Sequence, residues 1–185
     1  IKRRDFTINA LCMDKNENII DLLGGKKDLD NRLIKVIGVA DEKFKEDPLR
    51  MLRAVRFATV LDFEIEEETY QAICNNCALI DSLSGERIKE ELTKILSNEG
   101  FLYGLSLLEQ TKIAQVIGLN YKDINFTADI LGMWAQIDCE KITFSKTEKD
   151  NIAKIRQILN IKKIGNNELF NYGISKIPGG LDLSF

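Results

Sequence analysis

Three arginines on one predicted helix are the residues of this sequence best suited to hold an anion or to read a nucleobase. They are Arg50, Arg53 and Arg56 in the segment EDPLRMLRAVRFA, residues 46–58. Residues three positions apart on a helix are neighbours, so the arginines form one slanting ridge that begins at Asp47. The residues between them are apolar, and no acidic residue follows Asp47 within the helix. The ridge should therefore lie close to the core.

A guanidinium cannot lose its proton beside an apolar core, so each arginine needs an anionic or planar hydrogen-bonding partner. Two interpretations are open. In the first, the arginines are partly buried and form salt bridges with glutamates of neighbouring helices, such as Glu86, Glu90 or Glu91. In the second, they bind the phosphates or the base of a nucleotide. The periodicity alone does not decide between them.

The composition excludes several kinds of active site. The 185 residues include four cysteines and no histidine, which excludes histidine general bases and Ser-His or Cys-His nucleophile pairs within this chain. Cys74 and Cys77 form a C-x-x-C pair, but Cys12 and Cys139 stand at no recognisable zinc-ligand spacing. We therefore expect reduced cysteines in a cytoplasmic protein. We expect no membrane partner, because no apolar run reaches the roughly 18 residues of a membrane helix.

The elements that must position the ridge begin with a small sheet. Residues 6–13 alternate in strand fashion, the polar DKNEN forms a turn, and IIDLL completes a hairpin. GGKKDLDNR predicts a glycine break and a short helix, and residues 33–38 predict a third strand. No strand is expected after these three.

From Pro48 onward the sequence predicts helices. Asp47 suits the N-cap and Pro48 suits the first helical position, so the arginine helix should run from there to about Leu61. Further helices are expected over residues 66–76, 84–98, 101–110, 127–137, 146–160 and 167–174. The predicted fold class is α+β and mostly α.

The predicted helix at 84–98 carries the clearest periodicity. Ser84 suits its N-cap. The positions at i, i+4, i+7 and i+8 are all aliphatic and form one stripe, which consists of Ile88, Leu92, Ile95 and Leu96. We expect this stripe to face the core.

Four segments occur in an order that resembles a known family. In chain order they are RRDFTINAL, DLLGGKKDLDNRLIKVIG, FKEDPLRMLRAVRFA and GERIKEELTKIL. This set resembles the class II nucleotidyltransferases that add the CCA end to tRNA, and the related bacterial poly(A) polymerases. The resemblance covers about residues 1–97.

The resemblance implies three parts. Residues 1–44 would be the C-terminal part of the nucleotidyltransferase head and its small sheet, 45–110 a helical neck that binds nucleotide and RNA, and 111–185 a segment of the helical body. The implied function is template-independent addition of C and A to the tRNA 3′ end. The implied partners are tRNA, CTP and ATP.

The resemblance also assigns nucleotide-binding residues. Arg4 would contact the incoming nucleotide, Asp47 and Arg50 would face its base, and Arg53 and Arg56 would complete the ridge. The chemistry of the Asp–Arg pair agrees, because cytosine and adenine each present an amino donor beside a ring-nitrogen acceptor. Uracil and guanine present a carbonyl beside a ring N–H, which reverses both contacts. Such a contact is worth roughly 1–3 kcal/mol of discrimination.

Catalytic carboxylates are not expected within this sequence. Nucleotidyl transfer needs divalent ions such as Mg²⁺, held by carboxylates that lie close together. Asp28 and Asp30 lie on a predicted short helix. They are two positions apart along the helix, so their side chains point about 200° apart. The resemblance places the metal-binding aspartates upstream of Ile1, so we expect no metal ligand here. We also expect the isolated chain to be catalytically inactive.

Alternatives remain at this point. A poly(A) polymerase of the same family would share every motif. A non-catalytic RNA- or nucleotide-binding module would bind these ligands without catalysing the reaction. A helical scaffold would pair every ridge arginine with a glutamate. Six basic residues could touch RNA phosphates, although solvated surface cations are an equal explanation for each. These residues are Lys89, Lys94, Lys154, Arg156, Lys162 and Lys163.

Overall fold

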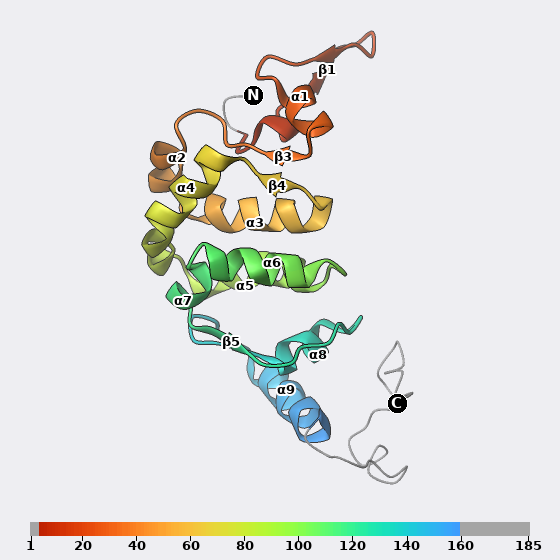
Figure 1. The fold of residues 1–185 in the computed structure, drawn as a ribbon. Coiled ribbons are helices and arrows are strands. Elements are labelled where there is room, and N and C mark those ends of the chain that lie inside the picture. The colour runs from red at the N-terminus through yellow and green to blue at the C-terminus, as the bar shows by residue number, and fades with distance from the viewer. Residues whose placement is uncertain (1–3, 160–185) are drawn as a thin grey trace.

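The computed structural model describes residues 4–159. Its short sheets and helices stack in successive layers along one axis, from the N-terminal hairpin at one end to α9 at the other (Figure 1). The elements in chain order are η1 (Thr7–Asn9), β1 (Cys12–Met13), β2 (Ile19–Ile20), α1 (Gly25–Asp30), β3 (Leu33–Ile34), α2 (Ala40–Glu46), α3 (Leu49–Leu61), β4 (Glu64–Ile65), α4 (Glu67–Asn76), η2 (Cys77–Ser82), α5 (Gly85–Leu96), α6 (Phe101–Gln110), α7 (Ile113–Val116), β5 (Leu119–Tyr121), α8 (Ile130–Ala135), β6 (Ile137–Cys139) and α9 (Lys146–Leu159). The predicted class, α+β and mostly α, is confirmed.

The N-terminal hairpin is present, but the predicted strand at residues 6–13 is mostly wrong. Only β1 pairs with β2, in antiparallel register. Residues 7–9 instead form the 3₁₀ turn η1, where the Asn9 side chain accepts a hydrogen bond from the Phe6 N–H. The Thr7 hydroxyl donates to Asp28 at 2.6 Å. Such side-chain hydrogen bonds compete with strand pairing, which the alternation of apolar residues does not reveal.

Three short strands lie beyond residue 40, where none was expected. β4 pairs in parallel with β3, and β5 pairs with β6 in antiparallel register. The predicted strand at 33–38 contracts to β3, although Val36 still forms a bridge to Phe6. Strands of two or three residues are too short to show an alternating pattern, so their partners alone define them.

The arginine helix α3 begins one residue later than predicted. Pro48 occupies the N-cap position rather than the first helical position. The carboxylate of Asp47 still accepts a hydrogen bond from the Leu49 N–H at 3.2 Å, so it caps the first turn from one position further out. The helix ends at Leu61, as expected. The preceding helix α2, which buries Phe44, was not predicted.

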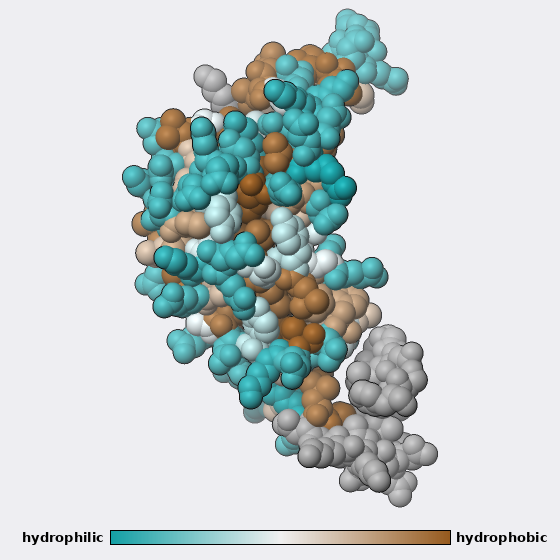
Figure 2. All heavy atoms as spheres, in the orientation of Figure 1, coloured by the Kyte–Doolittle hydropathy of each residue, from teal (hydrophilic) through white to brown (hydrophobic). Residues whose placement is uncertain are grey.

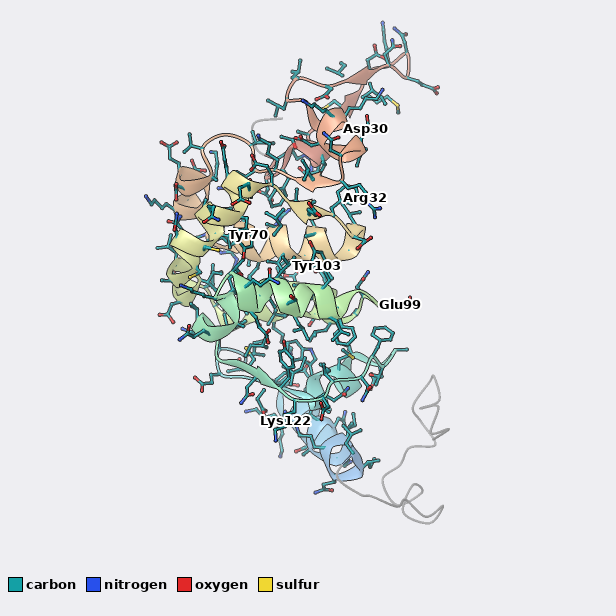
Figure 3. The ribbon with its side chains drawn as sticks, in the orientation of Figure 1. Asp30, Arg32, Tyr70, Glu99, Tyr103 and Lys122 are labelled. Carbon is teal, nitrogen blue, oxygen red and sulfur yellow. The ribbon has the colours of Figure 1, made fainter. Side chains whose placement is uncertain are left out.

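Helices α3, α5 and α6 pack on one another through the core. The whole predicted stripe of α5 is buried, and Ser84 is its N-cap, accepting from the Arg87 N–H. Helix α6 packs closely against α3 at Gly104. A Cβ at this position would stand 2.5 Å from the Thr59 hydroxyl, so the contact requires glycine. The Tyr103 hydroxyl donates to the carbonyl of Phe63 at 3.0 Å (Figure 3).

The C-terminal layer contains α8, β6 and α9. The helix expected at 127–137 is shorter and continues into β6, while α9 matches the helix expected at 146–160. The guanidinium of Arg156 joins these elements by donating to the carbonyls of Ala135 and Ile137. The helix expected at 167–174 lies outside the described residues.

One hydrophobic core connects all layers, from Phe6 to Ile152. Several apolar side chains of the N-terminal layer remain exposed, among them Met13, Ile19 and Leu22. Figure 2 shows hydrophobic atoms on the surface of this layer and mostly hydrophilic atoms along the outer edge of the helical layers. Among residues 4–159, no helix is both long enough and apolar enough to cross a membrane.

Candidate functional site

Arg50 is held by two acids and a backbone carbonyl. Its Nε donates to Oδ1 of Asp5 at 3.0 Å, and its Nη1 donates to the carbonyl of Lys43 and to Glu46 at 3.0 Å. Burial alone would lower the pKa of Arg50, but the hydrogen bonds to Asp5 and Glu46 outweigh it and raise the pKa. Within residues 4–159, the Nη2 of Arg50 has no hydrogen-bond partner.

Arg53 shares the same aspartate. Its Nη2 lies 2.9 Å from Oδ2 of Asp5, so one carboxylate joins two ridge arginines. The Nε of Arg53 is buried and lacks a partner among the described residues. The Arg53 side chain is 36% exposed, against 18% for Arg50.

Arg56 points toward α5 rather than toward Asp5. Its Nε lies 2.6 Å from Glu91, whose side chain is only 6% exposed. Lys94 also contacts Glu91, at 3.1 Å, and the Arg56 guanidinium lies 4.0 Å from the centroid of the Phe57 ring. A hydrogen bond to Glu90 raises the pKa of Lys94. This end of the ridge is an ion pair between two helices in which Glu91 is buried and Arg56 is 17% exposed.

Asp47 pairs with an arginine of another helix. The Nη2 of Arg87 lies 3.1 Å from Oδ1 and 3.3 Å from Oδ2 of the carboxylate. The backbone N–H of Arg50 donates to the carbonyl of Asp47 at 3.1 Å, but no side-chain hydrogen bond or ion pair joins the two residues within the described part of the chain. Arg4 is exposed and makes no ion pair there.

Every arginine of the ridge therefore has an acidic partner. The expected partner Glu91 is confirmed, whereas Glu86 and Glu90 form no ion pair with the ridge in residues 4–159. Two cavities of about 440 and 740 Å³ lie elsewhere, and their linings contain none of the ridge arginines. Arg50 and Arg56 contact glutamates, as the scaffold interpretation requires, but within residues 4–159 Arg53 contacts Asp5 and no glutamate. Arg50 and Arg53 also keep donors that have no partner among these residues.

Two important partners were not predicted. Asp5 stands 45 residues before Arg50, and nothing local in the sequence signals that contact. Arg87 precedes Glu91 by four residues within GERIKEELTKIL, and this spacing places both on one face of α5. That face meets α3, so the spacing is a signal that could have identified Arg87.

The described residues do not fit a metal ion. Within 4–159 no group of three or more Cys, Asp or Glu residues could hold one. Asp28 accepts from Thr7, and Asp30 lies at the end of α1, as labelled in Figure 3.

The candidate RNA-contacting cations are mostly engaged within the protein. Lys89 pairs with Glu148 at 2.8 Å, Arg156 pairs with Asp138 at 2.7 Å, and Lys94 pairs with Glu90. Lys154 is exposed. Lys162 and Lys163 lie outside the described residues.

Two family models match the chain. The model described as "Poly A polymerase head domain" matches residues 1–35. The model described as "Probable RNA and SrmB-binding site of polymerase A" matches residues 62–121.

Two curated relatives are both described as CCA-adding enzymes. The CCA-adding enzyme of Lactiplantibacillus plantarum is 37% identical over 177 residues, covering 93% of this chain and 43% of that protein. The CCA-adding enzyme of Lactobacillus delbrueckii subsp. bulgaricus is 56% identical over 95 residues, covering 51% of this chain and 24% of that protein. The chain thus spans about a quarter to a half of the length of the curated relatives it matches.

Solved structures of CCA-adding enzymes are similar to this chain in fold. The Bacillus stearothermophilus CCA-adding enzyme in complex with CTP is 28% identical, with a TM-score of 0.79 over 94% of this chain and 51% of that one. The Thermotoga maritima CCA-adding enzyme complexed with tRNA has a TM-score of 0.66 over 96% of this chain and 56% of that one. At 21% identity, the second likeness shows the fold alone. The chain belongs to the family of CCA-adding enzymes and related poly(A) polymerases, and it carries head-domain and RNA-binding sequence of that family.

Proposed function

We propose that this chain is part of a template-independent RNA nucleotidyltransferase that adds C and A to the tRNA 3′ end from CTP and ATP in the cytoplasm. The observation that best supports this proposal is that Arg50 and Asp47, at the start of α3, can still form further hydrogen bonds. The Nη2 of Arg50 is a spare donor within the described residues, and Oδ2 of Asp47 shares only one forked contact with Arg87.

That capacity matches two of the four bases. A carboxylate oxygen accepts from the amino group of cytosine or adenine, and a guanidinium N–H donates to the adjacent ring nitrogen. Uracil and guanine would place a carbonyl against the carboxylate and a ring N–H against the guanidinium. The pair would therefore favour C and A.

We assign the remaining candidates to the same nucleotide. Arg4 and Arg53 keep exposed surface and carry positive charge that suits a triphosphate. Arg56 completes the ridge in this proposal, although its buried pair with Glu91 gives it the weakest support. Mg²⁺, the expected cofactor, would supply the metal chemistry from ligands outside residues 4–159.

We also propose a division of the chain. Residues 1–44 would belong to the head, 45–110 to a neck that binds nucleotide and RNA, and 111–185 to the body. The extent of the family models, 1–35 and 62–121, supports a head segment followed by an RNA-binding segment.

Product analysis tests the proposal. A protein in which a complete head domain precedes this chain should extend tRNA lacking its 3′ end by CCA when given CTP and ATP. A product carrying only a run of A would instead indicate a poly(A) polymerase. Nucleotide binding without extension would indicate a non-catalytic module.

The isolated chain gives a second test. Residues 1–185 alone should incorporate neither CMP nor AMP, because the described part holds no metal-binding group. Detectable incorporation by this polypeptide would contradict the assignment of catalysis to residues outside it.

A further inference from the structure

The direction of the Arg50 guanidinium is set largely by the end of helix α2. Its Nη1 donates to the carbonyl of Lys43 at 2.8 Å and to Oε2 of Glu46 at 3.0 Å, and both residues lie in the last turn of α2. Its Nε donates to Asp5. Because the guanidinium is a rigid planar fork, fixing Nε and Nη1 also fixes where Nη2 points. Nη2 is the donor assigned above to the base, so its direction depends on where α2 lies.

Helix α2 depends on anchors in other parts of the fold. It has seven residues, far short of the length at which isolated helices become stable, and within residues 4–159 no side chain caps its N-terminus. Phe44, which is fully buried, is one anchor. The other is Asp41 in the first turn, whose Oδ1 accepts a hydrogen bond from the Asn76 amide at 2.5 Å. Figure 1 shows α2 beside α4, the helix that ends at Asn76.

Asn76 is well placed to hold α2. The residue is only 8% exposed, and its Nδ2 also donates to the carbonyl of Ala72 at 2.8 Å, one turn earlier in α4. The amide group is therefore fixed in direction by its own helix. Within residues 4–159, Asn76 forms no hydrogen bond with an arginine of the ridge, so its influence on the ridge must pass through α2.

We propose that Asn76 is a positioning residue for base selection: through Asp41 it holds the end of α2 in the place from which it directs the Arg50 guanidinium. This inference rests on the proposed function and extends the site to α4. If the contact between Asn76 and Asp41 only supports the fold, its loss lowers the stability of the protein and leaves the choice of base unchanged.

The test uses a protein that joins a complete head domain to this chain. Incorporation rates for all four triphosphates are compared between the parent and two variants, Asn76→Ala and Asp41→Ala, which remove the same hydrogen bond from opposite sides. We expect the preference for CTP and ATP over UTP and GTP to fall about fivefold in both, a typical size for residues that act through others. Asp41 is exposed, so its variant decides the question if Asn76→Ala folds poorly.

An exchange of the two side chains separates the hydrogen bond from the residues that form it. Asp41→Asn keeps an oxygen that can accept from Asn76, so it should retain most of the parental preference. Asn76→Asp places two carboxylates against each other, and their repulsion should displace α2 and reduce the preference. The double variant Asp41→Asn/Asn76→Asp restores a donor and an acceptor in reversed order and should regain the preference.

Thr111→Ala is a matched control for lost stability. Thr111 is fully buried, its hydroxyl donates to the carbonyl of Leu107 at 2.7 Å, and it follows α6, away from α2. Partial unfolding lowers the incorporation of all four triphosphates alike. This variant should therefore unfold at a lower temperature than the parent and keep the parental preference.

The outcomes distinguish this inference from the function on which it rests. A parental preference in both alanine variants, or a double variant that stays as low as Asn76→Asp, overturns the role of Asn76 while Arg50→Ala still reduces the preference. If the parent shows no preference, or Arg50→Ala does not alter it, the base-reading site itself is wrong and the inference about Asn76 fails with it.

Discussion

The two ends of the arginine ridge use the same residue type for different purposes. Arg56 meets one buried acid from a packed helix and lies against the Phe57 ring. Arg50 and Arg53 meet Asp5 from the N-terminal layer and retain guanidinium nitrogens without partners in the described residues. The first arrangement holds two helices together, whereas the second leaves capacity to bind something else.

The difference follows from what each acid can do. Glu91 lies in the middle of α5, where its backbone cannot move away from α3. Asp5 precedes the turn η1, and its one carboxylate is divided between two arginines. A charge that is divided in this way satisfies neither guanidinium fully, so a ligand can add contacts without breaking the fold.

Breaking the buried end should have the largest effect. We expect Arg56→Ala to lower the free energy of unfolding by roughly 3 kcal/mol, because it leaves Glu91 buried with only Lys94 as a cation. Denaturant unfolding of the 1–185 chain measures this. Arg53→Ala, at a more exposed position, is the control, and an equal loss in both variants would erase the contrast between the two ends.

Substituting Arg50 should alter selectivity more than folding. In the enzyme with a complete head domain, Arg50→Ala should weaken the use of CTP and ATP by roughly 1–3 kcal/mol and narrow the preference over UTP and GTP. Incorporation rates for the four triphosphates provide the measurement. A heavy loss of stability with an unchanged preference would make this end structural as well.

Asp5 tests whether the shared carboxylate organises the end of the ridge that contains Arg50 and Arg53. Asp5→Ala removes the partner of two arginines, and we expect it to cost about 1–2 kcal/mol of stability. Glu46→Gln, at a side chain that is 52% exposed, should change the stability much less, because solvent screens exposed ion pairs. Equal effects in thermal unfolding would show that Asp5 is only one of several interchangeable surface acids.

A surface pair elsewhere sharpens the contrast with Arg56–Glu91. The Lys89 ammonium, with the Ser145 N–H, lowers the pKa of Glu148 to about 2. A lowered carboxyl pKa stabilises the fold above the unfolded pKa near 4.5, and this contribution disappears as the pH falls toward 2. Because Glu148 is 34% exposed, solvent screening limits the contribution to about 0.5 kcal/mol.

Glu148→Gln should therefore be slightly less stable than the parent at pH 7 and equal to it near pH 2. Unfolding curves at both pH values, at low salt, measure the difference. A gap that persists at pH 2 would mean that packing against Lys89, and not charge, carries the effect.

Local patterns in the sequence determined the helices well. The Asp47–Pro48 start of α3, the Ser84 cap and the aliphatic stripe of α5 depend on neighbours within four positions, and the structure confirms them with a one-residue shift at α3. The four ordered motifs likewise sufficed to identify the family.

Only the tertiary structure decided which acid each arginine meets. The contacts of Arg50 with Asp5 and of Arg87 with Asp47 join residues 45 and 40 positions apart, and no local rule pairs such positions. The sequence predicted the strand that became β3, but its partner β4 was not predicted and is a strand only because the fold places it beside β3. Helix formation depends on residues that are close in the sequence. Strand pairing and the partners of ion pairs depend instead on which residues the packed layers bring close in space.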